Sequence, residues 1–153
     1  MFGKKEKANG NDVKESGSSK PQPANEQEEL RNNLAGVRKK IVVLSGKGGV
    51  GKSTVAVNLA VAIAKTGARV GLLDVDVHGP SVPTMLGLQG EPLSADSSGK
   101  IIPLVYGDSL KVLSVGFMLQ NKEDAVIWRG PLKYGIIKQF LKDVVWGELD
   151  YLI

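Results

Sequence analysis

The sequence predicts an α/β fold in which a parallel β-sheet lies between two layers of helices. From Ile41 onwards, short apolar runs typical of buried strands alternate with segments of helical periodicity. A glycine-rich stretch, SGKGGVGKST over residues 45–54, joins the first apolar run to the first helical segment. Strand, helix and strand within about 35 residues imply a parallel crossover.

The chain is expected to divide near residue 38. Residues 1–38 are predicted to form a disordered basic arm, because large apolar residues are almost absent before Pro23. A short helix is expected near 25–36, with Asn25 as its N-cap. Residues 39–153 are interpreted as the N-terminal part of one domain. This domain is expected to be incomplete at its C-terminus, because the sequence stops inside an apolar run.

Each predicted element follows from its own pattern. Continuous apolar runs indicate buried strands, and Gly67 is expected to stop the first helix. The buried face of that helix is predicted at residues 55, 59, 62 and 63. The expected elements, in chain order, are a strand over 41–45, a helix over 52–65, a strand over 69–74, a short helix over 82–86, strands over 101–106 and 111–115, an amphipathic helix through 136–144 and a strand over 149–153.

Composition limits the class of protein. The net charge is +4, but residues 1–40 hold nine Lys and Arg against six Asp and Glu, and residues 41–153 hold eleven against ten. A nearly neutral domain is a poor nucleic-acid surface. The chain has no cysteine, which excludes disulfides and thiolate metal sites within it. With no signal-like segment and no apolar run of about 18 residues, a soluble, cytoplasmic protein is expected.

The glycine-rich stretch matches a phosphate-binding loop. Gly46, Gly51, Lys52 and Ser53 fill the template G-x-x-x-x-G-K-[ST], between a predicted strand and a predicted helix. We therefore expect ATP and Mg²⁺ as cofactors, with Lys52 between the β- and γ-phosphates, Ser53 on the metal and Thr54 near the α-phosphate. The expected nucleotide-binding residues are Gly46, Lys47, Gly48, Gly49, Val50, Gly51, Lys52, Ser53 and Thr54.

Lys47 is not required by that template. With it, the loop resembles the deviant Walker A motif K-G-G-x-G-K-[ST] of the MinD/ParA/nitrogenase-iron-protein class of dimeric ATPases. The resemblance implies a homodimer in which Lys47 reaches phosphates bound by the other subunit and acts there, with Lys52, as a catalytic residue. The alternative is a solvated surface lysine.

Further motifs resemble the Mrp/ApbC-type iron–sulfur cluster carriers over residues 39–153: LLDVDVHGPSVPTMLG at 72–87, WRGP at 128–131 and WGELDYLI at 146–153. The resemblance implies a P-loop NTPase fold and an ATP-hydrolysing carrier that receives clusters from an assembly scaffold and delivers them to apo-proteins. A 4Fe-4S cluster is implied only for the full-length dimer, since the family's C-x-x-C pair is absent and no iron–sulfur ligand lies in this chain. Neither nucleic acid nor membrane is an expected partner.

Two aspartates end the second predicted strand, at the sheet edge where α/β folds bind ligands. Alternation is expected to place Asp74 and Asp76 on one face. The resemblance implies that Asp76 orients or deprotonates the attacking water and that Asp74 contacts Mg²⁺ through water; the alternative is that either caps the next turn. His78 is interpreted as a switch-loop residue rather than a metal ligand. WRGP is either an interface or switch-coupling segment or structural filler.

Two other functions stay open at this stage. A MinD/ParA-like positioning or partition ATPase would act on membrane or DNA, and it would need an amphipathic helix or a basic dimer face. A scaffold protein would use nucleotide binding only structurally. The motif at 72–87 favours the cluster carrier.

Overall fold

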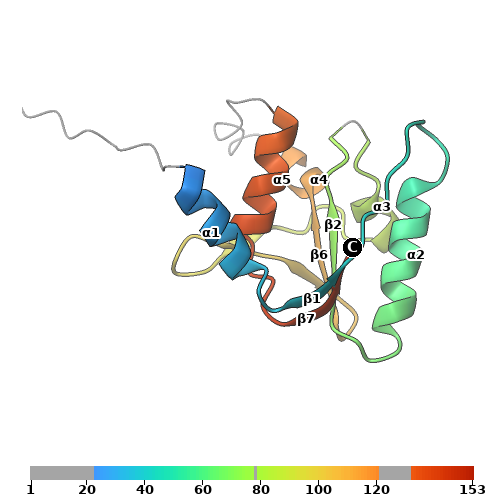
Figure 1. Ribbon diagram of the computed structural model, residues 1–153. Coiled ribbons are helices and arrows are strands. Elements are labelled where there is room, and N and C mark those ends of the chain that lie inside the picture. Colours follow the sequence, from blue (N-terminus) through green and yellow to red (C-terminus); the bar gives the residue numbers. More distant parts are fainter. Residues whose placement is uncertain (1–22, 78, 121–131) are drawn as a thin grey trace, which may run out of the picture.

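The computed structural model describes residues 23–77, 79–120 and 132–153. Its centre is a five-stranded sheet in the order β1-β7-β2-β6-β5, in which only the β5 pairing is antiparallel. Figure 1 shows α2 and α3 on one side of this sheet and α1 and α5 on the other. These three layers confirm the predicted α/β fold. The element bounds are α1 (Pro23–Asn33), β1 (Val37–Lys40), α2 (Lys52–Ala64), β2 (Val70–Asp74), α3 (Val82–Leu86), β3 (Ser94–Ala95), β4 (Ile101–Ile102), β5 (Leu104–Tyr106), β6 (Leu110–Ser114), α4 (Val115–Gln120), α5 (Leu132–Asp143) and β7 (Leu149–Leu152).

The central strands hold the core. Val70, Leu72, Val112 and Leu113 are almost wholly buried, as expected for strands covered by helices on both faces. Trp146 is also fully buried, and its indole nitrogen donates a hydrogen bond of 3.1 Å to the carbonyl oxygen of Phe140. The core therefore fixes β2 and β6 side by side, which places their carboxyl ends together.

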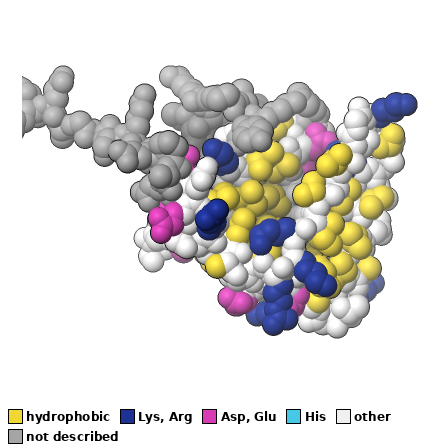
Figure 2. All heavy atoms as spheres, in the orientation of Figure 1, with side chains coloured by type: hydrophobic (Ala, Val, Ile, Leu, Met, Phe, Trp, Pro, Cys, Tyr) yellow, Lys and Arg dark blue, Asp and Glu magenta, His cyan; other side chains and the backbone are white. Residues whose placement is uncertain are grey.

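The first strand differs from its prediction. β1 covers residues 37–40, so Val37 and Arg38 belong to the sheet, and the predicted strand over 41–45 is wrong. The pairing ends there because Leu152, the last residue of β7, lies opposite Lys40. Val42 and Leu44 are each 78% exposed. Figure 2 shows hydrophobic side chains gathered over α2.

Helix α2 begins and ends where the sequence predicts. It starts at Lys52, and the amide of Gly67, at φ 86°, donates to the carbonyl oxygen of Ala64. Its buried face is different, since Val57 and Ala60 are buried whereas Val55 is 57% exposed. Nearly every residue from 55 to 64 is apolar. The periodicity of the sequence therefore does not indicate which face of α2 is buried. Packing against β2 determines the buried face instead.

The remaining elements mostly follow their predictions. Helices α3 and α5 and strands β2, β6 and β7 lie where expected, although Ile137 of α5 is partly exposed rather than buried. The predicted strand over 101–106 is divided by Pro103, which has no N–H to donate. Its first half pairs with β3 and its second half with β6.

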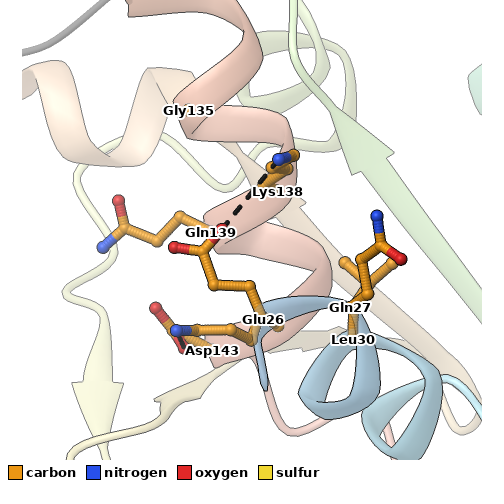
Figure 3. A pocket seen from close by; sticks show the side chains of 8 residues that line it. Glu26, Gln27, Leu30, Gly135, Lys138, Gln139 and Asp143 are labelled. Atoms are coloured by element: carbon orange, nitrogen blue, oxygen red, sulfur yellow. Dashed lines mark ion pairs between the residues drawn. The ribbon is translucent and has the colours of Figure 1, made fainter. Parts of the chain in front are cut away.

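Helix α1 covers residues 23–33 rather than the predicted 25–36, so the predicted N-cap Asn25 lies inside it, and the helix packs against α5. It ends at Asn33, whose side-chain amide donates to the carbonyl oxygens of Leu141 (2.8 Å) and Val144 (2.9 Å). Figure 3 shows side chains of α1 and α5 around a groove of about 490 Å³, with Lys138 4.0 Å from Glu26. This groove lies on the opposite side of the sheet from α2 (Figure 1) and is therefore separate from the glycine-rich loop.

Replacement of Asp150 by asparagine is expected to weaken the acid dependence of folding. The backbone amide of Arg69 donates to Asp150 Oδ2 at 2.9 Å, and this bond, with the guanidinium groups of Arg69 and Arg38, holds the pKa of Asp150 below its ordinary value of 3.8. A depressed pKa stabilises the fold above about pH 4, and this contribution disappears as the pH falls through the folded-state value. Thermal unfolding of Asp150→Asn between pH 7 and 3 measures the loss. The exposed Asp108→Asn is the control.

Candidate functional site

The glycine-rich loop, β2 and β6 meet at one edge of the sheet. Asp74 and Ser114 are register partners at the carboxyl ends of these parallel strands. The side chain of Lys52, the first residue of α2, reaches the same edge. The structure thus brings Lys52 to Asp74 and Asp76, which lie more than 20 residues later in the sequence.

The loop exposes its backbone. Gly49 (φ 74°) and Gly51 (φ 90°) adopt the left-handed conformation that favours glycine, and no atom lies within 4 Å of a Cβ placed on either. No side chain caps the start of α2, whose first helical bond runs from Val55 to Gly51. The amides before Val55 therefore need another acceptor, and an anion is suitable.

Lys47 lies on the outer part of this loop. Its amide donates to Ser45 Oγ (3.2 Å), and Ser45 Oγ donates back to the Lys47 carbonyl oxygen (3.1 Å). The Lys47 side chain is exposed and forms no salt bridge with residues that the structure describes. The fold therefore fixes the backbone of Lys47 while its ammonium group extends into solvent.

Lys52 and Asp76 form an ion pair that the sequence did not predict. Lys52 Nζ lies 2.6 Å from Asp76 Oδ2, and each side chain is 31% exposed. The sequence assigned Lys52 to phosphate and Asp76 to water. In the structure the ammonium group instead contacts the Asp76 carboxylate.

Asp74 is held from two directions. It is 8% exposed, and its Oδ1 accepts the backbone amide of Asp76 (3.0 Å), as the turn-capping alternative expected. Its Oδ2 accepts the hydroxyl of Ser114 (2.9 Å). Sequence reasoning missed Ser114. The available signal was a polar residue at the end of the apolar strand LKVLS.

The donor set suits Mg²⁺ better than a softer metal. Ser53 and Asp74 offer hydroxyl and carboxylate oxygens, which Mg²⁺ prefers. Among the described residues there is no group of three or more His, Cys, Asp or Glu side chains able to hold a metal. Mg²⁺ ordinarily relies on phosphates and waters for its other ligands, so two protein oxygens are sufficient.

Three predicted features lie outside the described residues: the part of the predicted arm before residue 23, His78, and the WRGP segment at 128–131. Within the described ranges, no helix is long and apolar enough to cross a membrane.

Comparison with known proteins agrees with the geometry. Residues 36–153 match the family model described as the NUBPL iron-transfer P-loop NTPase of the ParA group. An iron–sulfur cluster carrier protein of Methanocaldococcus jannaschii is 52% identical over 85% of this chain and 44% of its own length. The rat cytosolic Fe-S cluster assembly factor NUBP2 is 55% identical over 79% of this chain and 45% of its own length.

A solved structure is also similar. A nucleotide-binding protein of Archaeoglobus fulgidus in complex with ADP is 40% identical, with a TM-score of 0.68, over 82% of this chain and 46% of that one. The chain thus spans less than half the length of these relatives.

Proposed function

Because this chain belongs to the NUBPL-type iron-transfer P-loop NTPases of the ParA group, we propose that it is the nucleotide-binding part of an ATP-hydrolysing carrier that delivers iron–sulfur clusters to apo-proteins. The observation that carries the proposal is the convergence of the open glycine loop, Lys52 and Asp76 at one sheet edge. The family and the names of the relatives favour this function over a MinD/ParA-like positioning ATPase.

In the proposed cycle, ATP binds with its terminal phosphates over the loop amides and the start of α2. The Lys52 side chain then moves, so that its ammonium group leaves the Asp76 carboxylate and contacts the phosphates. Asp76 then serves as the base that orients the attacking water and accepts its proton. Ser53 and Asp74 would hold Mg²⁺, which neutralises phosphate charge when bound.

The proposed assembly is a homodimer. The ammonium of Lys47 extends into solvent from a loop fixed by Ser45, so it is able to approach phosphates bound by a facing subunit. This residue is proposed to link nucleotide binding to pairing of the two subunits.

The cluster is the cargo of the proposed carrier. This chain contains no cysteine, so the ligands of a 4Fe-4S cluster would come from outside it. The proposed site of action is the cytoplasm, in keeping with the word cytosolic in the name of the rat relative. An assembly scaffold would supply the cluster, and apo-proteins would receive it.

Reconstitution of the complete gene product with iron and sulfide tests the proposal. We expect the visible absorption of an iron–sulfur cluster, Mg-ATP hydrolysis and transfer of the cluster to an apo-ferredoxin at a rate that changes with Mg-ATP. Absence of cluster absorption, or of transfer, would contradict the carrier function. ATP-dependent pelleting with liposomes or DNA would favour the positioning ATPase instead.

A further inference from the structure

Ser114 has a hydroxyl group whose hydrogen-bond direction is fixed. The residue ends β6 and is fully buried. Its Oγ accepts a hydrogen bond from the backbone amide of Gly116 at 3.0 Å. Since an amide only donates, the hydroxyl proton is left for the neighbouring acceptor, Asp74 Oδ2, at 2.9 Å.

This bond orients a buried carboxylate. The other oxygen of Asp74 accepts the amide of Asp76, so donors from two segments hold the side chain. A buried carboxylate without such donors is costly, and charge-assisted bonds of this kind are strong. Each carboxylate oxygen retains a lone pair for a further ligand.

The same corner supports the chain that follows Asp76. A Cβ on Gly116 would lie 3.0 Å from Pro80 Cβ and 3.1 Å from Pro83 Cγ, which is closer than ordinary van der Waals contact. The backbone at Gly116 therefore packs directly against this proline-containing segment. Ser114 and Gly116 together brace both Asp74 and the segment downstream of Asp76.

We propose that Ser114 is a positioning residue for magnesium-dependent nucleotide binding, acting through its hydrogen bond to Asp74. The inference rests on the proposed function, because it assigns Asp74 to the metal. It adds a residue from β6, an element that contributes nothing to the phosphate-binding loop.

The test compares nucleotide affinities with and without Mg²⁺. Calorimetry with ADP on the complete gene product avoids any dependence on turnover. The ratio of the ADP affinities with and without Mg²⁺ is expected to be roughly 10-fold smaller in Ser114→Ala than in the unmodified protein. This is in the range usual for residues that orient metal ligands. The affinity of this variant for ADP without Mg²⁺ is expected to stay unchanged. Ser109→Ala, just before the start of β6, is the control, since the Ser109 hydroxyl makes only a long hydrogen bond to the carbonyl oxygen of Ala64 (3.4 Å).

A double-mutant cycle separates positioning from general damage. In the Asp74→Asn background, Ser114→Ala is expected to have no further effect on the Mg²⁺ dependence. Three results would overturn the inference about Ser114 without affecting the proposed function. These are an equal loss of ADP affinity with and without Mg²⁺, additive effects of the two substitutions, and an unchanged ADP affinity with Mg²⁺ in Ser114→Ala. If the unmodified protein shows no magnesium-dependent ADP binding, the proposed function falls and the inference falls with it.

Discussion

Replacement of Lys52 by alanine is expected to weaken binding of Mg-ATP to the complete gene product by roughly 100-fold, in line with the loss of charge-assisted hydrogen bonds to phosphate. Lys52 is the first residue of α2, and in the proposed cycle its ammonium group leaves Asp76 to join the loop amides around the phosphates. The fold should tolerate the change. The ion pair with Asp76 that disappears is partly exposed, and such pairs contribute little to stability.

Titration with a non-hydrolysable ATP analogue measures this affinity, and thermal unfolding verifies the fold. Lys65→Ala is the matched control, because Lys65 is an exposed lysine at the opposite end of the same helix. Wild-type affinity in Lys52→Ala would contradict the assignment of the loop as the phosphate site. A comparable loss in Lys65→Ala would indicate that helix charge in general, rather than Lys52, supports binding.

Local rules were sufficient to predict the loop and the helix that follows it. The helix start at Lys52 and the stop at Gly67 each depend on neighbouring residues only. The end of β2 was also predictable, because a continuous apolar run stops at Asp74. The sequence alone therefore predicts that the glycine-rich loop precedes α2 and that Asp74 ends β2.

Features that depend on strand order were not predictable. Ser114 meets Asp74 only because β6 lies beside β2, and β1 ends at Lys40 because its partner β7 ends opposite it, at Leu152. Similarly, the docking of α1 depends on Asn33 reaching the end of α5. None of these partners is close in the sequence, so no local pattern predicts which residues meet.

Replacement of Asp76 by asparagine is expected to separate binding from turnover. ATP hydrolysis should fall by at least about 100-fold, because an amide cannot accept the proton of the attacking water. Nucleotide affinity should be maintained or increased, because the neutral side chain competes less for the Lys52 ammonium, now 2.6 Å from the Asp76 carboxylate. Lys52→Ala is therefore expected to lose nucleotide affinity and Asp76→Asn is not, although the two variants alter the two halves of one ion pair.

Steady-state hydrolysis and equilibrium titration of the same preparation measure the two quantities, with the exposed Asp108→Asn as the control for a lost carboxylate. Equal hydrolysis rates in Asp76→Asn and the unmodified protein would favour a scaffold that uses nucleotide structurally. Weaker binding in Asp76→Asn would mean that the ion pair pre-orders Lys52 for phosphate instead of competing with it. Competition predicts that nucleotide affinity does not fall in Asp76→Asn, and pre-ordering predicts that it falls. The direction of the change in affinity therefore decides between them, and no absolute energy of the ion pair is needed.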